Sequence, residues 1–166
     1  CGRASKTTLV APPDVEQYLS LLARYDSDVY FRNIYNSIGT VPALAWKTGA
    51  TVRQESCTFI ENPYLTPSGR LYPCLFCHND EFSVTGVYEK GLVNSLAEGI
   101  PLWRSLLRIS RSRIEAIPEC RDCPGQLSCA GGCMGRAWGS CSNLLAADDR
   151  CEVRRAIYQM GGYSPL

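Results

Sequence analysis

Residues 120–133 read Cys-Arg-Asp-Cys-Pro-Gly-Gln-Leu-Ser-Cys-Ala-Gly-Gly-Cys. The proline and the glycines of this run are typical of tight turns, and glycine lets backbone N–H groups approach metal-bound sulfur closely. Two thiols separated by two residues, such as Cys120 and Cys123, can reach one metal centre from a turn, whereas their α-carbons are badly placed for a mutual disulfide. The run therefore predicts a metal or cluster site, and its local spacing fits both zinc and iron–sulfur clusters.

The other cysteines of the chain are distributed unevenly. The sequence holds 10 cysteines in 166 residues, and Cys1 is the only one among the first 56. A disulfide-stapled extracellular scaffold normally bridges the whole of a small chain, so this long cysteine-free segment disfavours it, although it stays open as an alternative. The cysteines outside the central run are Cys1, Cys57, Cys74, Cys77, Cys141 and Cys151.

The wider pattern of these cysteines identifies a family. In order it is Cys57, eleven residues, Gly69, four residues and Cys74, then the central run, and after a gap Cys151. Seven cysteines and this one glycine, over residues 51 to about 160, make the chain resemble the SPASM domain. That domain carries the auxiliary iron–sulfur clusters of radical S-adenosylmethionine (SAM) enzymes that mature peptides and proteins.

The resemblance implies two [4Fe–4S] clusters whose ligands are interleaved along the chain. Their cysteines form a first group, Cys57, Cys74 and Cys133, and a second group, Cys120, Cys123, Cys129 and Cys151. Cys133 then leaves the central run for the other cluster, as the last cysteine of a bacterial ferredoxin run does. Clusters of the [2Fe–2S] type stay open, and so does a structural zinc module for protein–protein contact.

The first group is one ligand short of four. Some members of the family have an extra cysteine just upstream of the first motif cysteine, but residues 51–56 contain none. Cys77 is the leading candidate for the eighth ligand, because it forms a Cys-x-x-Cys pair with Cys74. An iron open to water or substrate is the next alternative, followed by His78, Cys141 or Cys1.

A second departure from the family concerns catalysis. The radical SAM reaction needs a Cys-x-x-x-Cys-x-x-Cys motif, and the chain holds no such spacing, since Cys129 and Cys133 are followed by Arg136 at the third position. We therefore expect no SAM cleavage by this chain alone and no catalytic residue in it. The resemblance instead implies a C-terminal part or subunit of a radical SAM enzyme, with SAM bound by a barrel elsewhere and a peptide or protein as substrate.

The sequence divides near residue 50. In residues 1–50, Pro12, Pro13 and Asp14 start an amphipathic helix with apolar residues at i, i+3, i+4 and i+7 from Val15. The aromatic and β-branched run at 29–35 predicts a strand. This helix–strand segment would fit the end of a radical SAM α/β barrel.

Residues 51–166 predict a small, loop-rich α+β domain that binds the clusters. A hairpin turns at Pro67, Ser68 and Gly69 and would bring Cys57 close to Cys74. Short strand and turn elements follow at 82–87 and 91–96. A helix from Pro101 to before Pro118 would bury a stripe of four residues, Trp103, Leu106, Leu107 and Ile114. Further helices are expected at 134–138 and, after Asp148 and Asp149, to about Met160.

Composition bounds the partners. With 17 basic and 16 acidic residues the chain has no global field for a polyanion, so no nucleic-acid partner is expected. Its longest apolar stretches, such as 41–46, are too short for a bilayer span, and a soluble, cytoplasmic protein without a membrane partner is expected. Arg104, Arg108 and Arg111 are interpreted as a solvated helix face.

Overall fold

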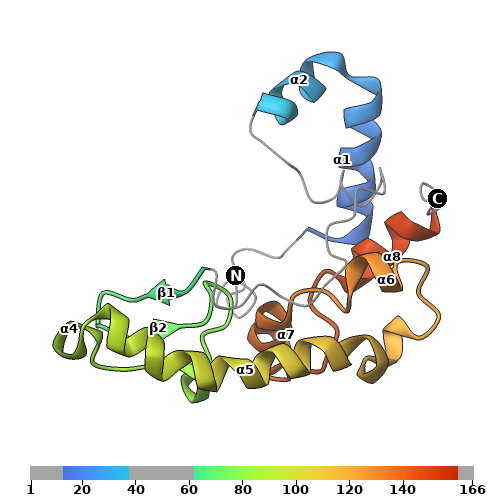
Figure 1. Ribbon diagram of the computed structural model, residues 1–166. Helices are drawn as coiled ribbons and strands as arrows, with labels where there is room; N and C mark the ends of the chain where they lie inside the picture. Colours follow the sequence, from blue (N-terminus) through green and yellow to red (C-terminus); the bar gives the residue numbers. More distant parts are fainter. Residues whose placement is uncertain (1–12, 38–61, 161–166) are drawn as a thin grey trace.

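The computed structural model describes residues 13–37 and 62–160, and helices predominate in both stretches (Figure 1). The first holds α1 (Val15–Ser27) and α2 (Val29–Ser37). The second holds α4 (Val87–Lys90), α5 (Leu92–Ala116), α6 (Gln126–Cys129), α7 (Met134–Cys141), α8 (Cys151–Gln159) and the 3-10 helices η2 (Asp80–Phe82) and η3 (Pro118–Cys120). One small antiparallel sheet joins them, formed by β1 (Tyr64–Leu65) and β2 (Leu71–Tyr72). In these described stretches, no helix is both long and apolar enough to cross a membrane.

The predicted hairpin is confirmed. Its strands pair Tyr64 with Tyr72 and Leu65 with Leu71. Gly69 takes a φ of +74°, in the left-handed region that glycine adopts without steric cost, and it closes the turn. The segment predicted as a strand at 82–87 contributes a single bridge, from Val84 back to Leu71. The hairpin lies over the N-terminal half of α5 (Figure 1).

Helix α5 is longer than the sequence predicts. It begins at Leu92, so the strand and turn expected at 91–96 are wrong, and Pro101 lies inside the helix rather than at its start. A proline inside a helix costs about 3 kcal/mol or more. Here buried residues continue along one face on both sides of it, at Ser95, Gly99 and Trp103. Burial of that whole face outweighs the cost of the proline, and the helix ends before Pro118 as predicted.

The helix predicted from Asp14 is confirmed as α1. The Asp14 carboxylate accepts a hydrogen bond of 2.8 Å from the Gln17 amide, and the Gln17 side chain accepts one of 3.1 Å from the Asp14 amide. This reciprocal capping box satisfies two backbone donors that a helix start leaves free. Leu22, one of the predicted apolar positions, is buried.

The strand predicted at 29–35 is wrong, because this segment forms helix α2. The Asp28 carboxylate accepts a 3.0 Å hydrogen bond from the Phe31 amide and starts the helix. Phe31 and Tyr35 lie one helical turn apart with ring centroids at 4.6 Å, and the Arg24 guanidinium of α1 covers the Phe31 ring. Aromatic contacts at helical spacing thus override the β propensity of these residues. Residues 13–37 therefore form a helical hairpin, and the expected helix–strand remnant of a barrel is corrected.

The described residues share two buried clusters. The first lies between the hairpin, α5 and the start of α7 and includes Leu71, Cys77, Val84, Val87, Trp103, Leu106 and Met134. The second joins α1 to α8 through Leu22, Val153, Ile157 and Tyr158. The helices expected at 134–138 and at the end of the chain are confirmed as α7 and α8. The division predicted near residue 50 lies outside the described residues.

Candidate metal centre

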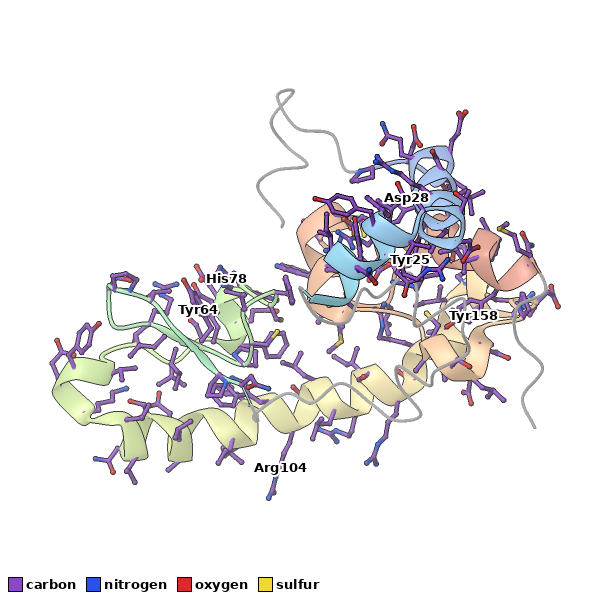
Figure 2. All side chains as sticks on the ribbon, turned by 90° about the horizontal axis from the view of Figure 1, so that it is seen from above. Tyr25, Asp28, Tyr64, His78, Arg104 and Tyr158 are labelled. Atoms are coloured by element: carbon purple, nitrogen blue, oxygen red, sulfur yellow. The ribbon has the colours of Figure 1, made fainter. Side chains whose placement is uncertain are left out.

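Four of the cysteines predicted to bind a cluster line one pocket. They are the second group of the sequence analysis, Cys120, Cys123, Cys129 and Cys151, named the pocket cysteines below. They come from the end of η3, the turn after it, the end of α6 and the first residue of α8. The cavity has a volume of about 10 Å³, and Ile117, Arg154 and Tyr158 form part of its wall. Figure 2 labels Tyr158 on α8.

Successive turns of the backbone bring these cysteines together. The carbonyls of Cys120, Cys123 and Cys129 each accept a hydrogen bond from the amide three residues further along, at 3.2, 3.0 and 3.0 Å. Pro118 starts η3, which leads into the first of these turns. Because each turn reverses the chain within a few residues, three cysteines spread over ten positions of sequence face the same pocket, and α8 adds Cys151 from outside the run.

Two glycines allow the wall of the pocket to close. A β-carbon at position 125 would lie 2.1 Å from the ring of Tyr158, and one at position 132 would lie 2.2 Å from the guanidinium of Arg154. Gly132 also has a φ of +73°, which side chains of L residues rarely tolerate. Gly125 and Gly132, which lie between the cysteines in the sequence, thus allow α8 to pack closely against the turns.

The thiols influence one another electrostatically. Burial, with a smaller contribution from the neighbouring pocket cysteines, raises the pKa of Cys120 from 9.0 to about 11. Burial likewise raises the pKa of Cys129 and of Cys151, and Arg154 opposes both shifts. Without a metal the three thiols are therefore protonated at neutral pH. A bound metal has to displace these protons, because thiolates are the ligands.

A buried ion pair adjoins the pocket. The Arg154 Nη2 and Asp148 Oδ1 atoms are 2.5 Å apart, with the Asp148 side chain fully buried and that of Arg154 9% exposed. Asp148 Oδ2 accepts a hydrogen bond of 2.8 Å from the Cys133 amide. Burial by itself would raise the pKa of Asp148, but Arg154 and the backbone donors lower it below its usual value. The sequence predicts Asp148 only as a helix starter, and its six-residue separation from Arg154 gives no helical pairing signal.

Arg113 is a second residue that the sequence reasoning missed. It is fully buried on α5, and its guanidinium donates to the carbonyls of Gly131 at 2.7 Å, Ala146 at 2.9 Å and Leu144. These carbonyls lie on both sides of α7, so one side chain fixes the segments around it. The available signal is position: Arg113 follows the buried Leu106 by seven residues on the same helix face. By contrast, Arg104, Arg108 and Arg111 are exposed, and Figure 2 shows Arg104 pointing away from the molecule.

The first group of cysteines is described only in part. Cys57 and Cys1 lie outside the described residues, so the expected approach of Cys57 to Cys74 is not addressed. Cys74 and Cys133 are half-buried, and Cys77 is completely buried. The Cys77 amide donates to the Cys74 carbonyl at 3.3 Å, which makes the predicted turn.

This turn packs on helix α7. A β-carbon at Gly135 would meet the Phe76 backbone at 2.7 Å and the Cys77 amide nitrogen at 2.9 Å. Gly135 follows Cys133 by two residues. The contact therefore places the Cys74–Cys77 turn beside the segment that carries Cys133.

The other candidates for the eighth ligand lie elsewhere. Cys141 is exposed at the end of α7, and its Sγ donates to the Ala137 carbonyl at 3.0 Å. The exposed His78 ring stacks between the rings of Tyr64 and Tyr72, with centroids at 5.0 and 4.7 Å; Figure 2 labels Tyr64 and His78 side by side. A Cys-x-x-Cys-His run is also the spacing of c-type haem attachment. The burial of Cys77 in an apolar cluster opposes that use here.

Within residues 13–37 and 62–160, no group of three or more His, Cys, Asp or Glu side chains is arranged to hold a single metal ion. Comparison with protein-family models, with curated proteins and with solved structures found no match to the chain.

Proposed function

We propose that this chain binds two iron–sulfur clusters and serves as an auxiliary electron-transfer and substrate-positioning domain in radical SAM-dependent maturation of a peptide or protein. One observation carries the proposal: the four cysteines that the resemblance assigns to one cluster are the four that line one pocket. These four cysteines span residues 120 to 151 of the sequence. Their position around one pocket is a separate observation from the sequence spacing that suggested them as ligands.

Zinc and a four-iron cluster differ in the spacing they require of their ligands. A tetrahedral zinc ion with Zn–S bonds of 2.3 Å requires sulfur atoms about 3.8 Å apart. A four-iron cluster takes one thiolate at each of four separate irons, so its ligands stand further apart. The four pocket cysteines line a common space and could serve either arrangement, and the resemblance to the SPASM domain favours the second.

The residues around the thiols suit a redox centre. Ile117 and Tyr158 supply apolar wall, which limits access of water, and burial of this kind tunes the potential of a cluster. Arg154 supplies N–H donors and positive charge toward Cys129. A cluster bound there would supply one-electron transfer. The chain's own residues hold it, shield it from water and set the charge around it.

The proposal assigns the first cluster to Cys57, Cys74 and Cys133, with Cys77 as the candidate for its fourth ligand. The contact between the Cys74–Cys77 turn and the start of α7 supports a shared centre for this group. SAM binding belongs to a radical SAM barrel, in the same polypeptide or in a partner subunit. The substrate is a peptide or protein segment, and an open iron, if Cys77 is no ligand, would bind its side chain directly.

The test uses one pocket cysteine and one matched control. Cys151→Ala removes a proposed ligand, whereas Cys141→Ala removes an exposed thiol on a helix end. After anaerobic preparation, electron paramagnetic resonance should show the signal of one cluster altered or lost in Cys151→Ala, and the iron content of this variant should be lower than that of the parent. Cys141→Ala should retain both signals. Equal iron, sulfide and spectra in Cys151→Ala and the parent protein would refute the assignment.

A further inference from the structure

The buried pair of Asp148 and Arg154 lies between the two cysteine groups. Asp148 Oδ2 accepts from the Cys133 amide at 2.8 Å and from Arg154 Nη1 at 3.2 Å. Arg154 lines the pocket of the second group. A short polar path therefore runs from the backbone of a first-group cysteine, through the ion pair, to the wall of the other site.

The pair has a fixed direction. Its negative end contacts Cys133, and its positive end faces the pocket cysteines. Gly132 keeps this direction, because its α-carbon packs against both side chains and leaves no room for a β-carbon beside Arg154. The Arg150 amide also donates to Asp148 Oδ1 at 3.1 Å, which holds the carboxylate from the other side. The pair is thus an oriented dipole in a buried place.

Other charges near the two groups do not reproduce this direction. The guanidinium of Arg113 acts on Cys133 and on Cys120 alike, so it influences both groups in the same sense. Arg155 lines the pocket from a half-exposed position and donates to the Glu119 carbonyl. Its positive charge lies on the pocket side as well and adds to the effect of Arg154, whereas the exposed carboxylate of Glu119, which also lines the pocket, opposes it.

We propose that the Asp148–Arg154 pair sets the order in which the two centres accept electrons, with the pocket centre reduced first. This inference rests on the proposed function, since it requires both clusters to be bound. An electron is stabilised beside positive charge and destabilised beside negative charge, and water screens little of this in a buried site. The positive end raises the reduction potential of the pocket centre, and the negative end lowers that of the centre that includes Cys133.

The main test separates the effect of the two charges from the effect of side-chain shape. Asp148→Asn combined with Arg154→Gln removes both charges while keeping amide groups in their places, and Arg154→Lys keeps the charge. Arg104→Gln removes one solvent-exposed charge, on a side chain of α5 that points away from the molecule, and serves as control. The full chain with its clusters is titrated anaerobically with dithionite, and each one-electron reduction is followed by electron paramagnetic resonance. Cys151→Ala identifies which signal belongs to the pocket centre.

The expected result is specific to the double variant. The equilibrium constant for moving an electron from the first centre to the pocket centre should fall at least tenfold, which is about 59 mV for a one-electron couple. Arg154→Lys and Arg104→Gln should keep the order and separation of the parent. An unchanged separation in the double variant, or a pocket centre reduced second in the parent, would overturn the inference.

A second variant covers the case in which the double variant does not fold. Asp148→Asn alone keeps an acceptor for the Cys133 amide and removes only the negative end, so the first centre should become easier to reduce. No change in either potential would again overturn the inference. Iron and sulfide are measured in every sample. A parent protein without clusters refutes the proposed function itself, whereas intact clusters with unchanged potentials refute only the role of the pair.

Discussion

Gly135 lies directly against the backbone of Cys77, since a β-carbon at position 135 would come within 2.9 Å of the Cys77 amide nitrogen. The contact joins two segments that are far apart in the sequence, the Cys74–Cys77 turn and the start of α7. Cys77 is completely buried in the apolar cluster of the hairpin and α5, and its partner Cys74 is half-buried against it. The Cys74–Cys77 turn can therefore lie this close to the segment that carries Cys133 only because residue 135 is glycine.

Gly135→Ala should destabilise the protein by about 1–3 kcal/mol, the usual cost of overpacking. Alanine in place of glycine ordinarily stabilises a helix interior by about 1 kcal/mol, so a net loss identifies the backbone contact as its cause. Urea denaturation measures the change. Ser140→Ala, at an exposed position of the same helix, is the control and should change stability little. A Gly135→Ala protein as stable as the parent would contradict the contact.

The eighth ligand can be identified by paired substitutions. If Cys77 completes the first centre, Cys77→Ala should open one iron, shift the potential of that centre and increase its sensitivity to oxygen. The pocket centre should not change, because its four thiols are untouched. Cys141→Ala should leave both centres as they are. Identical spectra and potentials for Cys77→Ala and the parent would leave an open iron as the better account.

Gly125→Ala should impair the pocket. The new methyl group would lie 2.1 Å from the Tyr158 ring, so helix α8, which carries Cys151, has to move. We expect loss of the pocket centre in this variant and partial recovery in Gly125→Ala combined with Tyr158→Ala, which removes the obstructing ring. Iron content and electron paramagnetic resonance report both. A parent-like iron content and spectrum in Gly125→Ala would show that α8 can move to accept the methyl group without loss of the pocket centre, which would contradict this prediction.

The raised pKa of Cys120 predicts an unusual pH profile for the metal-free, reduced chain. Burial favours the thiol over the thiolate and raises the pKa from 9.0 to about 11. Between these two pH values the folded state keeps the Cys120 proton while the unfolded chain loses it. The contribution of the protonated thiol to the free energy of unfolding is therefore complete below pH 9 and disappears as the pH passes about 11. Alkylation of Cys120 by iodoacetamide, followed by mass spectrometry, should have its midpoint near pH 11 in the folded chain and near pH 9 in urea. Midpoints that coincide near 9 would count against burial of this thiol.

Features fixed by local chemistry could be predicted from the sequence. The capping residue Asp14 determines the start of α1, and Gly69 determines the turn of the hairpin, because each acts on a few neighbouring residues. Pro118 likewise ends α5 at the expected place. The grouping of the four pocket cysteines comes from the resemblance to the SPASM domain, since local spacing alone would group Cys120, Cys123 and Cys129 with Cys133.

Features decided by distant contacts could not be predicted. The β-prone residues 29–35 are helical because Phe31 and Tyr35 pack at helical spacing beside Arg24 of α1. Helix α5 passes through Pro101 because its buried face continues on both sides. The buried Arg113 is a charged residue on an apolar stripe, and its carbonyl partners lie in segments whose positions only the folded chain reveals.

The most direct test of the central claim is the iron and acid-labile sulfide content of the anaerobically purified full chain, measured together with its absorption spectrum. Two four-iron clusters require about eight irons and about eight sulfides per chain, with a broad sulfur-to-iron charge-transfer band near 400 nm. That composition, in a brown solution, is the result we predict. A colourless protein that contains about one or two equivalents of zinc and no sulfide would contradict the account.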